Sequence, residues 1–290
     1  MAALRLRVEA YSWQGNGTQR PRKPLTMEDA TTDHTGGAPT RRWLDELGLA
    51  TTFLTRLPWP WAVPQDRPLM AAAWALPVAG LLAGIVAALA LGVGEAVGLP
   101  AMAAAILGVA AGAMATGALH EDGLADLVDG FGGGRNADSK RRIMRDSHVG
   151  SYGVLALILV TAAKIVAVTA LMPVGIGVTA LLVAHTLGRA VIPALVLWQP
   201  FAAEDGLARL AGRPDIKGAA WAAGIGAGFA VVLLPAGIGV AAAVAAAGTT
   251  VAIGWLARRQ IGGVTGDVLG AAEQAAEVAA LLAIAAYLGM

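Results

Sequence analysis

The sequence predicts an all-α fold: a polytopic transmembrane helical bundle of about seven spans, with the N-terminus in the cytoplasm. The first observation is composition, because the chain of 290 residues is 57% hydrophobic and only 14% charged, with a mean hydropathy of +0.64. A soluble domain carries about 25% charged residues. The other two observations are a series of long apolar stretches and the placement of basic residues between them.

Seven apolar stretches approach the ~20 residues that a helix needs to cross the hydrocarbon core. They are rich in Ala and Gly, which let helices approach closely in lipid. Two are less clear: only "LPAG" separates the fifth from the sixth, and the seventh contains Glu273, Gln274 and Glu277. The stretches cover residues 69–93, 100–119, 152–172, 176–198, 218–235, 237–257 and 271–289.

Basic residues occupy alternate connections between these stretches. The connections near 94–99, 173–175 and 236 contain no Lys or Arg. By the positive-inside rule, the basic connections and the N-terminus lie in the cytoplasm, which predicts a multi-pass protein of the cell (inner) membrane. The basic residues are Arg41, Arg42, Arg56 and Arg67 before the first stretch, Arg135, Lys140, Arg141, Arg142 and Arg145 in 120–151, Arg209, Arg213 and Lys217 in 199–217, and Arg258 and Arg259 after the sixth.

Residues 1–40 differ in composition from the rest of the chain. They are rich in Thr, Gly, Pro and charge and lack the apolar core of a signal peptide. We therefore expect a disordered N-terminal extension over 1–40, to which we assign no function, and a membrane-embedded domain over 41–290. The formal net charge of +1 gives no bulk attraction to nucleic acid, and the absence of cysteine excludes disulfides and Cys-ligated zinc.

A cluster of carboxylates follows the second apolar stretch, in "ALHEDGLADLVDGFGGGR". Asp122, Asp126 and Asp129 are spaced i, i+4, i+7, so a helix places them on one face, with Glu121 about 100° away. Three like charges on one face repel one another unless a cation lies among them. Mg²⁺ binds carboxylate oxygens and bridges to substrate phosphates. We predict that the three aspartates are metal ligands and catalytic, with Glu121 a weaker candidate; the alternative is a solvated acidic helix end.

Glycines and arginines after this cluster suit an anion. Consecutive glycines in "DGFGGGR" can present backbone N–H groups to phosphate, although a flexible turn explains the run equally well. Arg135 ends this run, and Arg141 and Arg145 share one helical face in "SKRRIMRDS". Arginine forks bind phosphate oxygens, but each of these arginines alone is also explained by topology. Asp146 is a candidate to orient an arginine or to complete the metal shell.

Charged residues inside the apolar stretches form a second group. Lys164 lies near the middle of the third stretch, and His185 and Arg189 share a face of the fourth. Unpaired cations in lipid are costly, so these side chains are expected to face the bundle interior, either in structural ion pairs or in a polar cavity that binds phosphate. Asp267 stands at the cytoplasmic entrance to the seventh stretch and is a further catalytic candidate, and Glu277 lies deeper.

Carboxylate-bound metal, arginines and glycines at one membrane face are what phosphoryl-group transfer requires. A cation-coupled transporter is the main alternative, because the intramembrane charges suit an ion path. The acidic cluster lies at one face rather than at the midplane, which counts against a transporter. An intramembrane prenyltransferase also uses aspartate-rich Mg²⁺ motifs, but the chain has a single cluster without a second Asp-x-x-x-Asp repeat.

Four motifs resemble the cobalamin synthase family, the adenosylcobinamide-GDP ribazoletransferases, over roughly residues 41–290. The N-terminal extension does not fit that family. The resemblance implies an integral inner-membrane enzyme that uses Mg²⁺, joins adenosylcobinamide-GDP to α-ribazole or its 5′-phosphate, and releases GMP; a homo-oligomer is left open. The motifs are "FLTRLP" (53–58), "GALHEDGLADLVDGFGGG" (117–134), "IMRDSHVGSYGVLAL" (143–157) and "IGGVTGDVLGA" (261–271).

Overall fold

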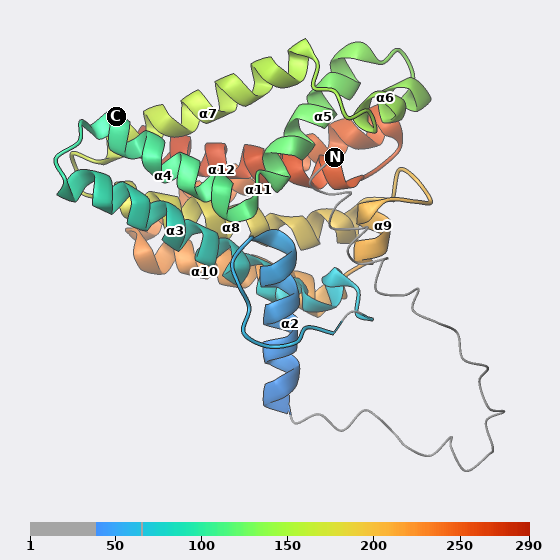
Figure 1. Cartoon of the computed structure of the whole chain (residues 1–290), viewed down its shortest axis with the longest axis horizontal. Helices are drawn as coiled ribbons and strands as arrows, with labels where there is room; N and C mark the ends of the chain where they lie inside the picture. The colour runs from blue at the N-terminus through green and yellow to red at the C-terminus, as the bar shows by residue number, and fades with distance from the viewer. Residues whose placement is uncertain (1–38, 65) are drawn as a thin grey trace.

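The computed structural model describes residues 39–64 and 66–290, and Figure 1 shows their arrangement as a bundle of helices. Within these residues the regular elements are helices, and one isolated parallel bridge joins Phe201 to Val264. The expected disordered segment 1–40 lies outside the described residues except for its last two. The helices are α2 (Pro39–Leu54), η2 (Leu69–Ala75), α3 (Leu76–Ala96), α4 (Ala101–Thr116), α5 (Leu119–Gly133), α6 (Ala137–Met144), α7 (Ser151–Leu171), α8 (Gly177–Trp198), α9 (Leu207–Ala211), α10 (Ile216–Leu233), α11 (Ala236–Ile261) and α12 (Gly266–Tyr287).

The all-α, multi-span prediction is confirmed. Among the described residues, six helices are long and apolar enough to cross a membrane, and there are up to seven spans if the bent pair α4 and α5 forms one of them. The two stretches that were less clear in the sequence both form helices at the expected places. The chain between α10 and α11 is short but separates two distinct helices, and α12 qualifies as a span despite its carboxylates.

The second expected span differs from the prediction. It is not one helix over 100–119, because α4 ends at Thr116 and α5 leaves it at 90°. Gly117 and Ala118 both adopt left-handed backbone conformations, and the Ala118 N–H donates to the Ala113 carbonyl at 2.8 Å, which closes α4 in a Schellman-type end. The 16 residues of α4 rise only about 24 Å, less than the ~30 Å hydrocarbon core. The carboxylate cluster therefore lies on the second helix of a bent pair rather than in a loop after a span.

Helices α8 and α12 form the interior of the bundle. In the most apolar 18-residue segment of each helix, 78% of the residues of α8 and 72% of those of α12 are buried. The corresponding share is 22% in α7 and in α10, which lie at the periphery. Helix α12 packs on α5, α7, α8 and α11, while α8 also packs on α3 and α10. Much of this interior is alanine, so the helix backbones approach closely.

The two ends of the bundle differ in charge and in helix capping. In Figure 1, α6 and α9 lie at one end, whereas the α3–α4 and α7–α8 connections and the C-terminus lie at the other. At the first end, side chains cap the helices: Asn136 accepts from the Ser139 N–H, Asp215 from Gly218 and Thr265 from Val268. We call this the basic end, because it holds the connections rich in Lys and Arg.

Candidate functional site

The site is built on a close contact between two helices at the basic end. A Cβ at Gly123 of α5 would lie 3.1 Å from the Asp267 Cα of α12, and a Cβ at Gly270 would lie 3.1 Å from the His120 carbonyl oxygen. Because neither glycine has a side chain, the two backbones touch. The acidic face of α5 is thereby placed against the first turn of α12.

Three carboxylates from these two helices lie within electrostatic reach of one another. Asp126 interacts with both Asp267 and Asp122, which are all negatively charged when ionised. Asp126 is only 6% exposed, and its Oδ2 accepts no hydrogen bond from the described part of the chain. Asp267 accepts from the Thr265 hydroxyl at 3.3 Å and stands in the first turn of α12, where the helix dipole favours an anion. The arrangement concentrates negative charge and leaves a buried oxygen unpartnered.

Asp129 has a different environment from the other two aspartates on its face. Its two oxygens accept the Gly150 N–H at 2.7 Å and the Gly153 N–H at 2.9 Å, so the carboxylate caps the N-terminus of α7. Within the residues described, no three His, Cys, Asp or Glu side chains are gathered as ligands for one metal ion. The structure thus adds Asp267 to the carboxylates near Asp126, while Asp129 is engaged by two backbone N–H groups, and the metal role of the aspartates stays a prediction.

Glu121 faces away from this group, as its position on the helix predicts. Its Oε1 accepts from the Gln274 amide at 3.2 Å, and Gln274 also donates to Glu273. Glu121 therefore belongs to the polar interior of the bundle, and its catalytic role stays a prediction.

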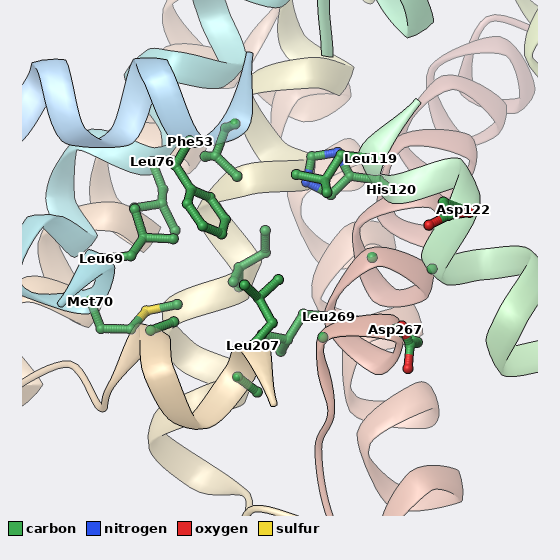
Figure 2. A pocket seen from close by; sticks show the side chains of 17 residues that line it. Phe53, Leu69, Met70, Leu76, Leu119, His120, Asp122, Leu207, Asp267 and Leu269 are labelled. Carbon is green, nitrogen blue, oxygen red and sulfur yellow. The ribbon is translucent and has the colours of Figure 1, made fainter. Parts of the chain in front are cut away.

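A pocket lies beside the carboxylates, and we call it the apolar pocket (Figure 2). It holds about 620 Å³ of empty space, open solvent included. Figure 2 shows aliphatic and aromatic side chains on one side and Asp122 and Asp267 on the other. The lining residues are Phe53, Leu54, Leu69, Met70, Leu76, Leu119, His120, Asp122, Gly123, Ile192, Leu207, Ala208, Ala211, Gly266, Asp267, Leu269 and Gly270.

A second pocket adjoins the first, and we call it the basic pocket. It is lined by Arg141, Arg145 and Arg209 and holds about 570 Å³ of empty space, open solvent included. The two pockets share four lining residues from α9 and the start of α12: Leu207, Ala208, Gly266 and Asp267. A carboxylate therefore stands at the boundary between an apolar and a basic cavity.

Arg141 and Arg145, which share one helical face, both line the basic pocket, and their phosphate-binding role stays a prediction. Arg141 donates to the Ile261 carbonyl at 2.9 Å and also pairs with Asp138. Arg145 pairs with Asp205 at 2.6 Å across the pocket wall. These contacts join α6 to the end of α11 through Arg141 and to the chain before α9 through Arg145.

The intramembrane charges form a buried network between α7, α8 and α12. Lys164 pairs with Glu277, and Arg189 pairs with Glu277 and Glu273. His185 lies 2.6 Å from Glu277. These side chains face the interior, as predicted, and they form ion pairs there. The structure does not bring Lys164 or Arg189 into the lining of either pocket, and their phosphate-binding role stays a prediction.

Arg135 and Asp146 also lie outside the lining of the two pockets. Arg135 is exposed between α5 and α6. Asp146 accepts from His148, and this hydrogen bond lowers the pKa of the Asp146 carboxyl below its ordinary value. Neither position supports the predicted contact with a phosphate or a metal, although their roles stay predictions.

The glycine run has a structural role instead of forming an anion-binding loop or a turn. Helix α5 continues through Gly133, and the Gly134 N–H donates to the Gly130 carbonyl. A Cβ at Gly130 would lie 3.0 Å from the Lys140 carbonyl, and one at Gly132 would lie 2.7 Å from the Tyr152 ring. The glycines therefore allow α6 and the start of α7 to pack closely on α5.

Several lining residues were not singled out by sequence analysis. Phe53 and His120 stand within two of the quoted motifs, which are the only signal that could have marked them. Arg209 counts in the sequence only as a loop charge, and Asp205 and Leu207 carry no pattern. Arg209, Asp205 and Leu207 reach the pockets only because the 199–217 connection folds against α12.

Comparison with known proteins decides the family. The cobalamin-5-phosphate synthase family matches residues 46–285. The chain belongs to this family. The matched segment includes both pockets and every candidate site residue. The resemblance of the four motifs to the cobalamin synthase family is thereby confirmed.

Relatives of the cobalamin-5-phosphate synthase family cover nearly the whole chain. An adenosylcobinamide-GDP ribazoletransferase of Bradyrhizobium diazoefficiens is 42% identical over 248 residues, which are 85% of this chain and 95% of the relative. The protein of the same name from Mesorhizobium japonicum is 41% identical, with 83% and 93% covered. That from Shewanella frigidimarina is 38% identical, with 84% and 97% covered. No solved structure has a significant match to the chain.

Proposed function

We propose that this chain is an adenosylcobinamide-GDP ribazoletransferase, which joins adenosylcobinamide-GDP to α-ribazole or its 5′-phosphate and releases GMP. Family membership and relatives of that name at about 40% identity support the activity. The location of the site rests on one observation: Asp267 lines both the apolar and the basic pocket. A carboxylate between an apolar cavity and an arginine-lined cavity suits transfer from a pyrophosphate to a hydroxyl group.

The reaction exchanges a phosphoanhydride bond for a phosphoester bond. A ribazole hydroxyl oxygen forms a bond to the phosphorus on the corrinoid side of the pyrophosphate, and the bond from that phosphorus to GMP breaks. The hydroxyl proton passes to a carboxylate, and GMP leaves with the bridging oxygen. The protein must therefore accept a proton, hold the reactants in line and stabilise negative charge on the phosphates.

The residues present fit a bound Mg²⁺. Asp126 offers an unpartnered buried oxygen, with Asp122 and Asp267 as carboxylate neighbours. Mg²⁺ usually needs only one or two carboxylates, because waters and substrate phosphates complete its shell. When bound there, the ion would neutralise charge on the pyrophosphate.

The remaining roles follow from position. We assign proton acceptance to Asp267 or Asp122, which line the apolar pocket, and phosphate binding to Arg141 and Arg145, whose forks suit phosphate oxygens. We assign Asp129 to the positioning of α7 on α5 rather than to metal binding. The basic end is placed in the cytoplasm, since its connections carry the Lys and Arg residues. The active site then faces the cytoplasm from the inner membrane.

The activity is tested with purified protein in detergent. We expect GMP release only when both adenosylcobinamide-GDP and α-ribazole are present, loss of release after chelation with EDTA, and recovery on addition of Mg²⁺. A cation-coupled transporter would release no GMP under any of these conditions. Release that persists in EDTA would remove the metal from the proposal while leaving the transferase activity in place.

A further inference from the structure

The walls of the apolar pocket come from seven elements, α2, η2, α3, α5, α8, α9 and α12, which meet only in the folded chain. Phe53 of α2, Leu69 and Met70 of η2 and Leu76 of α3 form its apolar side in Figure 2, and Ile192 of α8 also lines the pocket. Four of these five side chains are buried, and Phe53 is partly exposed. This side offers a flat or bulky apolar group a desolvated surface, and the lining there has no charged side chain.

The polar groups of the same pocket lie together at its other side. His120, Asp122 and Asp267 are its polar side chains. His120 is held in place, because its Nδ1 lies 3.2 Å from an Arg189 guanidinium nitrogen of the buried network. Since Asp267 also lines the basic pocket, the order through the site is apolar wall, carboxylates, arginines.

We infer that the apolar pocket binds the benzimidazole base of the ribazole substrate, with its ribose toward Asp122 and Asp267, while the activated pyrophosphate occupies the basic pocket. This inference rests on the proposed function and assigns one substrate to each cavity. The base is flat and largely apolar, and the ribose hydroxyl that reacts must lie beside a carboxylate. The site meets both requirements, because its apolar wall is followed by the carboxylates.

The chemistry of the other reactant argues against the reverse assignment. Guanine carries several hydrogen-bond donors and acceptors, which would lose their partners against Phe53, Leu69, Met70 and Leu76. A corrin ring with its amide side chains is likewise too polar for this apolar wall, where its amide groups would lose their partners.

Two matched alanines allow the assignment to be tested. Ala211 lines only the apolar pocket and Ala203 lines only the basic pocket. We expect Ala211→Phe to raise the KM for α-ribazole about 10-fold or more while the KM for adenosylcobinamide-GDP stays within twofold, because pocket discrimination of ~10–200-fold follows even small volume changes. Ala203→Phe should show the opposite pattern.

The same comparison distinguishes failure of the inference from failure of the proposed function. Calorimetric binding of α-ribazole needs no turnover, and we expect Ala211→Phe to weaken it while Ala203→Phe leaves it within twofold. Binding of this pattern without GMP release in wild-type protein would support the pocket and refute the transferase activity. Normal GMP release with an unchanged KM for α-ribazole in Ala211→Phe would overturn the inference alone.

A smaller substitution guards against a folding defect. Ala211→Val adds less volume beside the same cavity than Ala211→Phe does. We expect the KM for α-ribazole to rise from wild type to Ala211→Val and further to Ala211→Phe. Loss of co-purified lipid from Ala211→Val without any change in either KM would show that an acyl chain occupies the pocket, and would overturn the inference.

Discussion

At the scale of single residues, three aspartates on one face of α5 meet three different environments. Asp122 lines the apolar pocket, Asp126 keeps a buried oxygen without a partner, and Asp129 caps α7 with both oxygens. Helical periodicity predicts that the three share a face, but it does not say which elements stand opposite that face. The shared face therefore divides into a part beside the apolar pocket, for which we propose a catalytic role, and a part that caps α7.

This division predicts different effects for the same substitution. Asp122→Asn and Asp126→Asn should lower kcat/KM for GMP release about 100-fold or more, since a lost carboxylate removes several kcal/mol of transition-state stabilisation. Their thermal unfolding in detergent should match wild type, because neutralisation relieves repulsion. Asp129→Asn should lower the free energy of unfolding by about 1–3 kcal/mol, since its amide is a poorer acceptor for two N–H groups. Equal destabilisation in all three variants would contradict this account.

The arginines of the basic pocket give a second prediction at this scale. Arg141→Lys and Arg145→Lys should lower kcat/KM about 10-fold, or ~1.4 kcal/mol, because lysine keeps the charge but loses the planar fork that binds two phosphate oxygens. Arg142→Lys is the matched control, since Arg142 is exposed on the same helix and does not line the pocket. Steady-state kinetics in detergent measure the effect. Wild-type kinetics in both pocket variants would leave these arginines with a topological role only.

At the scale of elements, the site depends on how closely α5 and α12 approach. The 90° bend after α4 directs α5 across α12, and the glycine contact between them removes the usual side-chain spacing. The buried network of Lys164, Arg189, Glu273 and Glu277 ties α7 and α8 to the same α12. Charges in lipid are costly unless paired, so this network fixes which helices stand together. The resulting frame is what holds Asp267 beside α5.

A single methyl group should disturb this frame. Gly123→Ala places a Cβ 3.1 Å from the Asp267 Cα, where backbone rather than a flexible side chain must move. We expect kcat/KM to fall about 10-fold or more while the protein remains folded, because small misplacement of reacting groups is costly in rate. Gly224→Ala on α10 is the control, since a Cβ there meets no atom within 4 Å. Circular dichroism and GMP release compare the two variants, and equal activity would show that α5 and α12 tolerate wider spacing.

At the scale of the whole molecule, charge is segregated along the bundle. The pockets, the side-chain helix caps and the Lys- and Arg-rich connections all lie at one end, while the opposite connections lack basic residues. The positive-inside rule sets the orientation from such a distribution. Under the proposed orientation, we expect water-soluble substrates to reach the site from the cytoplasm.

Orientation can be measured because the chain contains no cysteine. Ser147→Cys places a thiol at an exposed position of the basic end, and Val174→Cys places one in the α7–α8 connection. We expect a membrane-impermeant maleimide to label Val174→Cys in intact spheroplasts, and Ser147→Cys only after permeabilisation. Labelling of Ser147→Cys in intact spheroplasts would reverse the orientation and move the site out of the cytoplasm.

The sequence by itself determined the properties that depend on local composition. Stretches of apolar residues gave the spans, because a helix in lipid must match the bilayer along its own length. The alternation of basic connections indicated that these connections share one end of the bundle, and the four-residue spacing of Arg141 and Arg145 indicated that they share one helical face. Four motifs pointed to the family that comparison then established.

Only the tertiary structure decided which distant groups meet. The left-handed conformation of Ala118 has no signal in its residue type, so the bend that turns α5 was not predictable. The capping of α7 by Asp129, the pairing of Lys164 with Glu277 and the place of Asp267 between two pockets all join separate helices. Hydropathy and spacing act along one helix, whereas these contacts arise from the packing of several, in which small residues and buried charges select the neighbours.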